Sequence, residues 1–213
     1  MGATSLRRYT NIASALHVLR NRSISLLNPA FWDDRNDAYY LASYKYRTQA
    51  ASVLALCFAR APETYHHWRV FSSGGDGLCI EFDEARLIEA IGKDDAVTAR
   101  DVIYKEIKDV SGGPIATEDL PFLKRIPYRD EQEFRLLYVN PTVRTEFHHI
   151  PIPVTAISRI TLSPWMAAPL AKSVKDTLKE LPRCQVIKIY QSTLVENERW
   201  KRAANPDLDL YGT

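Results

Sequence analysis

The order of strand-like and helix-like segments restricts the fold of this chain more than any other feature. Residue patterning predicts about eight or nine strands and about four or five helices, which do not alternate strictly. The segments 133–139, 146–150 and 156–162, for example, are three consecutive predicted strands with no helix between them. A parallel doubly wound sheet needs a helix between successive strands. The sequence therefore predicts an α+β fold, in which flanking helices pack on a mixed, mostly antiparallel, twisted sheet.

The predicted elements can be placed along the chain. Apolar runs and period-two alternation predict strands, whereas apolar residues at helical spacing behind a capping residue predict helices. The predicted strands span 5–9, 23–27, 53–59, 78–83, 98–106, 133–139, 146–150, 156–162 and 184–190. The predicted helices span about 10–20, 34–47, 84–92 and 166–180, with short ones at 63–71 and 117–124.

Length and composition indicate a single globular domain. The chain has 213 residues, of which 46% are hydrophobic and 25% charged, as is typical of soluble proteins with a packed core. We expect one domain over 1–213, with a core at about 5–190 and a polar C-terminal tail at 191–213. The net charge of +2 provides no strong overall attraction to nucleic acid or to a membrane surface.

Several features favour a cytoplasmic protein without a membrane partner. The first residues, MGATSLRRYT, lack the apolar stretch of a secretory signal. The longest apolar run, 50–59, is too short to span a bilayer. The cysteines, Cys57, Cys79 and Cys184, are odd in number and far apart. We expect them to be reduced thiols that fill the core.

Two pairs of adjacent histidines raise the question of a metal site. His148 and His149 lie in a predicted strand, where neighbouring side chains point to opposite faces. His66 and His67 have no ligand partner at a spacing such as HExxH. We therefore expect no bound metal.

The acidic loop before the second predicted helix has two possible roles. Its residues, Asp33-Asp34-Arg35-Asn36-Asp37, include carboxylates that can bind a divalent ion. Carboxylates also favour the first turn of a helix, where backbone N–H groups are unpaired and the helix dipole is positive. We favour the helix start.

The stretch YRDEQEFRLLY, residues 128–138, contains the most suggestive pair of acids. Glu131 and Glu133 are two positions apart, so on a strand their side chains share a face and lie roughly 7 Å apart. Carboxylates in such a place can accept hydrogen bonds from a sugar hydroxyl and stabilise positive charge that develops on a ribose ring. The alternative is the exposed start of a strand, with Arg135 paired to a neighbour.

Four sequence stretches, taken in their order along the chain, resemble a family of bacterial and phage proteins known mainly as a domain of unknown function. The resemblance covers about residues 5–165, and the order of the motifs carries it. In the first loop that family usually has an Asn-Asp-Pro sequence between aromatic residues, from which this chain departs. The matching stretches are LRRYT at 6–10 with SISLLNPAFWDD at 23–34, the strand ending in Cys57-Phe58, Trp68 with GLCIEFD at 77–83, and YRDEQEFR at 128–135 with IPVTAISRITLSP after it.

The same layout is similar to the NAD-dependent ADP-ribosyltransferases, notably the toxins that modify DNA bases. Arg8 and Thr10 match the first strand of that family, and Ser23 and Ser25 are alternative matches to the second, polar strand. Glu133 matches the late glutamate. The resemblance implies NAD as cofactor, with Arg8, Tyr9, Thr10 and Ser25 near the dinucleotide. It also implies that Glu133 bonds a ribose hydroxyl while nicotinamide leaves.

Further roles follow from the same resemblance. Glu131, upstream of Glu133, would help to choose or activate the acceptor. A tyrosine of the second predicted helix, Tyr40 among Tyr39, Tyr40 and Tyr44, could stack on nicotinamide, although residue types favour packing of these rings into the core. Arginines could hold Glu133 ionised or bind the pyrophosphate. The candidates for the first task are Arg129 and Arg135, and those for the second are Arg7, Arg8, Arg20 and Arg22.

Three functions remain open from the sequence. The first is an ADP-ribosyltransferase-like enzyme, such as a toxin or phage-defence effector, acting on a nucleic acid or protein. The second is a non-catalytic interaction, immunity or anti-defence protein with the same fold. The third is a metal-dependent nuclease that uses Asp33, Asp34 and Glu133. The residues do not distinguish the acceptor or the oligomeric state.

Overall fold

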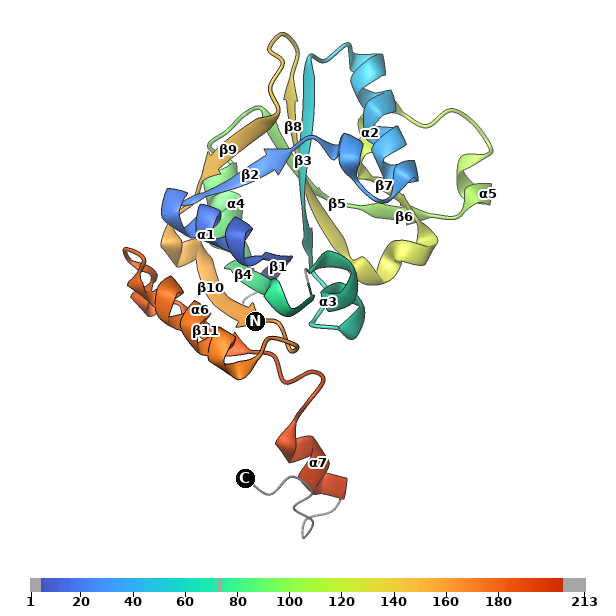
Figure 1. The fold of residues 1–213 in the computed structure, drawn as a ribbon. Coiled ribbons are helices and arrows are strands. Elements are labelled where there is room, and N and C mark those ends of the chain that lie inside the picture. Colours follow the sequence, from blue (N-terminus) through green and yellow to red (C-terminus); the bar gives the residue numbers. More distant parts are fainter. Residues whose placement is uncertain (1–4, 73, 205–213) are drawn as a thin grey trace.

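The computed structural model describes residues 5–72 and 74–204 of the chain (Figure 1). The strands are β1 (Ser5–Asn11), β2 (Ser23–Leu27), β3 (Ser52–Ala59), β4 (Gly77–Asp83), β5 (Val97–Asp101), β6 (Ile103–Lys105), β7 (Leu123–Arg125), β8 (Glu133–Asn140), β9 (Phe147–Pro151), β10 (Ile157–Leu162) and β11 (Lys188–Gln191). The α-helices are α1 (Ile12–Asn21), α2 (Arg35–Thr48), α3 (Tyr65–Phe71), α4 (Glu84–Ile91), α5 (Ile107–Val110), α6 (Ala168–Glu180) and α7 (Glu198–Ala204). The expected α+β class is confirmed.

The main sheet has nine strands and forks at β3. One edge of β3 pairs with β8 along its whole length, from Ser52↔Asn140 to Ala59↔Glu133. The other edge pairs with two different strands, with β1 at Ala59 and with β2 at Ala55. Among the described residues, no strand covers this edge between those two positions. The fork therefore leaves backbone groups of β3 open on one side.

Most strand pairs are antiparallel, as the sequence predicts. On one side of the fork, β1 continues through β4 and β10 to β11, and only the β10–β11 pair of this sheet is parallel. On the other side, β2 pairs with β9 and β8 pairs with β5. A separate two-stranded parallel sheet consists of β6 and β7. The mixed, largely antiparallel sheet is thus confirmed.

The two faces of the β3–β8 pair have different surroundings. Side chains alternate across a strand, and one set, including Phe58 and Leu136, joins the large hydrophobic core. The opposite set begins with Glu133 and Arg135 and continues with Leu137, which packs in a smaller cluster with Leu41 of α2. A charged stretch and a small apolar cluster therefore share the face that α2 covers (Figure 1).

Local sequence signals account for the boundaries of the helices. The side chain of Asn11 accepts a hydrogen bond from the backbone of Ser14 at the start of α1. Asp34 does the same for Asn36 and Asp37 at the start of α2, which confirms the helix-start interpretation of the acidic loop. Such caps satisfy N–H groups that have no partner inside the helix.

The structure corrects two expectations about strands. The predicted strand 98–106 is two strands, β5 and β6, which belong to different sheets. The predicted strand 184–190 starts as a 3-10 helix at Cys184–Val186 and becomes β11 only at Lys188. The tail at 191–213 contains α7, and its last residues lie outside the described part of the chain. Short apolar runs do not distinguish a strand from a helical turn.

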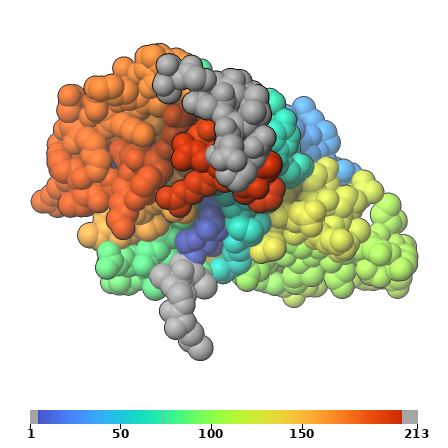
Figure 2. Space-filling model, turned by 90° about the horizontal axis from the view of Figure 1, so that it is seen from below, coloured from blue at the N-terminus to red at the C-terminus, as the bar shows by residue number. Residues whose placement is uncertain are grey.

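Seen from below, the orange segment from β10 to β11 forms one end of the molecule, and the red α7 lies near the middle of the view (Figure 2). The orange surface of β10, α6 and β11 lies opposite the green to yellow surface of residues from about 100 to 140. Within the described residues, none of the helices has the length and apolar character needed to cross a membrane.

Candidate active site

A pocket of about 540 Å³ opens at the fork of the sheet. It is bordered by β1, by the open edge of β3, by the loop before α2 and by the segment leading into β8. Strands that diverge from a common neighbour leave such a space, because no ladder of hydrogen bonds holds their backbones together. The lining comprises Arg7, Arg8, Tyr9, Leu27, Phe31, Trp32, Asp33, Asp34, Asp37, Ala55–Ala59, Val70, Phe71, Lys124, Tyr128, Glu131 and Glu133.

Four of the predicted site residues line this pocket. Arg8 and Tyr9 come from the first strand, whereas Glu131 and Glu133 lie far along the chain. Local sequence patterns cannot show that these two segments meet. The fold brings them together because β1 and β8 flank the same strand, β3.

Thr10, Ser25 and Tyr40, which were predicted near the cofactor, lie outside the lining, as do the pyrophosphate candidates Arg20 and Arg22. Ser25 lies opposite His149 on the β2–β9 pair, and its hydroxyl is 2.8 Å from His149 Nδ1. Thr10 lies opposite Leu78 on β4. Tyr40 is a partly buried residue of α2. A role for these residues in cofactor binding stays a prediction.

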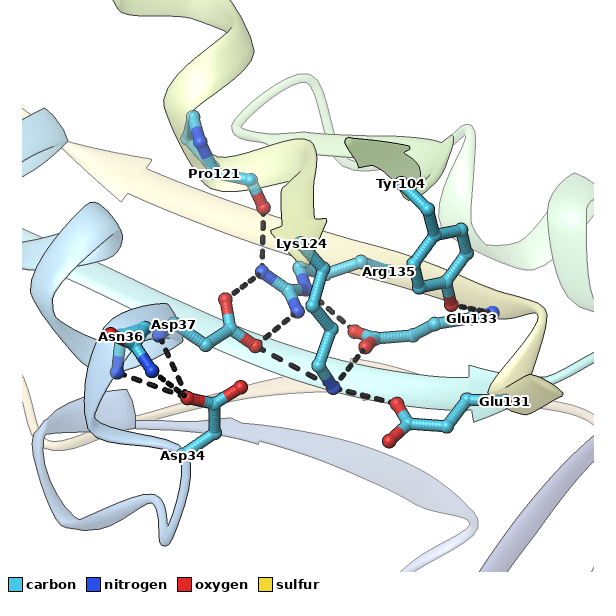
Figure 3. Close-up of polar contacts among 9 residues, drawn as sticks. All are labelled: Asp34, Asn36, Asp37, Tyr104, Pro121, Lys124, Glu131, Glu133 and Arg135. Atoms are coloured by element: carbon cyan, nitrogen blue, oxygen red, sulfur yellow. Dashed lines mark hydrogen bonds and ion pairs between the residues drawn. The ribbon is translucent and has the colours of Figure 1, made fainter. Parts of the chain in front are cut away.

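Glu131 and Glu133 do not share a strand, which corrects the geometry expected from their spacing. Glu131 ends a 3-10 helix, Ile126–Glu131, and Gln132 has a left-handed backbone with φ of 45°. Glu133 then begins β8. The two carboxylates nevertheless converge, because each contacts the ammonium of Lys124, at 2.6 Å for Glu131 and 3.2 Å for Glu133 (Figure 3).

Arg135 holds the other carboxylate oxygen of Glu133. Its Nε donates to Glu133 Oε1 at 2.7 Å. Its terminal nitrogens donate to both carboxylate oxygens of Asp37 and to the backbone carbonyl of Pro121 (Figure 3). The Arg135 side chain is fully buried, so a complete set of partners compensates for its lost hydration. The expectation that Arg135 lies beside Glu133 is confirmed, whereas Arg129 contacts exposed Asp130 instead.

The charges around Glu133 fix its protonation state. Burial alone would raise the pKa of Glu133, but Arg135 and Lys124 outweigh burial and lower this pKa to about 2. For Glu131, burial raises the pKa and Lys124 offsets the shift only in part. The two acids therefore differ: Glu133 is ionised at all physiological pH values, and Glu131 accepts a proton more readily.

The basic wall of the pocket is provided by β1. Arg8 donates from Nη1 to the carbonyl of Cys57 at 3.0 Å, on the open edge of β3. Burial lowers the pKa of Arg8, and the described residues show no carboxylate paired with it. Arg7 donates to the carbonyl of Ala61 and lies 3.7 Å from Glu81. Arg8 therefore has guanidinium donors that can bind an anionic ligand.

Sequence patterns did not identify several pocket residues. Lys124 had no distinctive spacing relative to Glu133, and Asp37 stood out only as part of the acidic loop before α2. Trp32 and Tyr128 line the pocket in place of the helix tyrosines. Each has a cation over its ring, Arg135 at 5.0 Å from Trp32 and Lys124 at 4.9 Å from Tyr128.

Cys57 also belongs to this wall. All three cysteines are free thiols, as expected, and Cys79 and Cys184 are buried. Cys57 instead lines the pocket, which corrects its assignment as core filler. Burial, and next the charge of Glu133, raises the pKa of this thiol, so it is a weak nucleophile there.

The described segments hold no candidate set of metal ligands. They contain no cluster of three or more His, Cys, Asp or Glu residues arranged to hold an ion. Asp34 is occupied as a helix cap, and both oxygens of Glu133 contact cations.

Comparisons with known proteins place the chain near one group of structures. No family model and no curated protein matches it. Among solved structures, it is similar to DarT of Thermus sp. 2.9 in complex with NAD⁺, with 12% identity and a TM-score of 0.48, over 90% of this chain and 96% of that one. DarT complexes with ADP-ribosylated single-stranded DNA and with carba-NAD⁺ give 13% and 11% identity and TM-scores of 0.47 and 0.44. They cover 95% and 97% of the DarT chains and 90% of this one. The resemblance to the family of unknown function stays a prediction.

Proposed function

We propose that the pocket binds NAD and that the protein transfers ADP-ribose from it to a macromolecular acceptor, a nucleic acid or a protein. One observation carries the proposal: Arg8 and Glu133, from distant parts of the chain, line the same pocket. The proposal also rests on the sequence resemblance, which expects these two residues to act together. The volume is within the range of small-molecule sites.

The charges of the pocket suit a dinucleotide with a cationic nicotinamide ring. Arg8 has spare donors for a pyrophosphate, which its guanidinium can bind in a bidentate manner. In the acid cluster, Asp37, Glu131 and Glu133 outnumber Lys124 and Arg135, so that three carboxylates and two cations leave one negative charge. A net negative charge stabilises positive charge on a nearby ring.

The reaction would use the two acids differently. Glu133 would accept a hydrogen bond from a ribose hydroxyl and stabilise positive charge on the ribose as the bond from C1′ to nicotinamide breaks. Nicotinamide would leave with the bonding electrons, and the acceptor would form the new bond to C1′. Glu131, whose pKa is raised, would take the acceptor's proton.

A non-catalytic interaction protein is the second candidate, and one observation favours it. Both carboxylate oxygens of Glu133 already contact cations, Oε1 with Arg135 and Oε2 with Lys124. Its side chain is only 5% exposed. A ribose hydroxyl would have to share Glu133 with Lys124. Roles as a toxin or phage-defence effector stay predictions, as does the acceptor class.

Incubation with labelled NAD tests the proposal. The wild type should release nicotinamide and label one class among single-stranded DNA, duplex DNA, RNA and protein. Glu133→Gln should abolish both signals and leave the protein folded. Glu146→Gln is the matched control, because it makes the same charge change at an exposed position outside the pocket. Failure of the folded wild type to bind NAD in a thermal-shift assay would favour the interaction protein, and loss of activity with a chelator would indicate a metal enzyme.

A further inference from the structure

The convergence of Glu131 and Glu133 on one ammonium needs an explanation, because their backbones do not align them. The left-handed Gln132 separates a 3-10 helix from β8, so each acid leaves a different element. Hydrogen bonds and ion pairs of the described residues show one side chain that touches both carboxylates, that of Lys124. This side chain is 9% exposed and lines the pocket.

Lys124 is itself held by the small sheet that lies over the start of β8. It is the central residue of β7, and its direct partner on β6 is Tyr104. The hydroxyl of Tyr104 accepts a hydrogen bond from the backbone N–H of Glu133 at 2.9 Å. One pair of neighbouring residues therefore contacts Glu133 at both its backbone and its carboxylate (Figure 3).

Arg135 and Lys124 differ in how far buried partners restrict their side chains. Arg135 has its guanidinium occupied by Glu133, Asp37 and Pro121, all in buried positions. Lys124 reaches Asp37 only at 3.9 Å, and its flexible side chain borders the pocket. A movement of Lys124 would change the direction of both acids. A movement of Arg135 would instead leave buried Asp37 without its bidentate partner.

We infer that Lys124 is a positioning residue that sets the joint orientation and ionisation of Glu131 and Glu133 toward the ligand. The expected effect of Lys124 on activity rests on the proposed function, whereas its expected effect on the charges of the two acids does not. Without the ammonium, three carboxylates would share only Arg135, and Glu131 would bind a proton at a higher pH.

The test compares Lys124→Met, Lys124→Arg and the control Lys105→Met. Lys105 is exposed and lies on β6 of the same sheet, and its replacement by Met removes the same charge. We expect Lys124→Met to lower kcat by about 100-fold, as small misplacements of catalytic groups do, with little change in KM for NAD. The acid limb of the pH–rate profile should move to higher pH. Lys124→Arg should recover most of the rate, and Lys105→Met should behave as wild type.

A second measurement applies even when the wild type shows no turnover. Burial already raises the pKa of Glu131 in the wild type, and loss of the Lys124 ammonium would raise this folded-state pKa further above the unfolded value. As pH falls, the folded variant would bind this proton before the folded wild type does, so the variant would gain stability relative to the wild type. The Tm difference between wild type and Lys124→Met should thus shrink from pH 7 to about 5, while that of Lys105→Met stays constant. A pH-independent difference for Lys124→Met would overturn the inference. Loss of turnover in the wild type alone would overturn only the proposed function.

Discussion

Arg135 donates to both carboxylate oxygens of Asp37, at 2.8 and 2.6 Å, in a pair with essentially no exposure to solvent. Asp37 comes from the first turn of α2 and Arg135 from β8. The pair thus connects the helix to the sheet through charge, directly beside the pocket acid Glu133. Its removal should affect both the stability of the fold and the shape of the pocket.

Replacement of Asp37 should destabilise the protein strongly. Asp37→Ala leaves Arg135 buried without its bidentate partner, and breaking one side of a buried ion pair costs about 3–5 kcal/mol. Urea unfolding measures the change. Asp130→Ala is the control, because its carboxylate is 89% exposed and surface changes stay within about 0.5 kcal/mol. A cost for Asp37→Ala below about 1 kcal/mol would show that the pair is not structural.

Glu133 should make the stability depend on pH in acid. Its folded-state pKa of about 2 lies below the ordinary value of 4.5, so the unfolded chain binds its proton first as pH falls. The stabilisation from ionised Glu133 is therefore complete above pH 4.5 and is lost as pH falls toward 2. The difference in unfolding free energy between wild type and Glu133→Gln should be largest near neutrality and shrink over this interval. A constant difference down to pH 2 would contradict the assigned ion pairs.

Arg8 should matter more for ligand binding than for folding. Its partly buried guanidinium donates to a carbonyl, and burial lowers its pKa, so the free protein gains little from its charge. Arg8→Met should leave the Tm near that of the wild type and weaken NAD binding by about 10- to 100-fold, as expected for a lost charge-assisted contact. Differential scanning calorimetry measures the Tm, and isothermal titration calorimetry measures the affinity for NAD. Arg20→Met, exposed on α1 and outside the pocket, should change neither.

Cys57 should alkylate slowly despite lining the pocket. Its raised pKa leaves little thiolate at pH 8, and the thiolate is the reactive form. Mass spectrometry after iodoacetamide treatment should show labelling at least about tenfold slower than in the urea-unfolded chain. NAD should slow it further by covering the pocket. Rapid labelling of the folded protein would mean that the thiol is ionised and that the charge balance around Glu133 differs.

Local signals in the sequence were enough to determine most elements and the class of the fold. Caps such as Asn11 and Asp34 and the alternation along 78–83 act between near neighbours, so they can be identified without knowing the fold. Arg8 and Glu133 were named as site residues because of the family resemblance, and their roles stay predictions.

Only the tertiary structure decided how the site is built. The fork at β3, the position of Lys124 and the Asp37–Arg135 pair depend on which segments approach one another, and ion pairs have no fixed spacing along a chain. The left-handed Gln132 moved Glu131 off the strand on which its spacing had placed it. Ser25 and Tyr40 point to the same limit: their residue types suited a cofactor site, but their elements place them outside the pocket. The hydrophobic pattern of the sequence predicts which side chains are buried. Which partner a buried charge contacts depends on how the elements pack together.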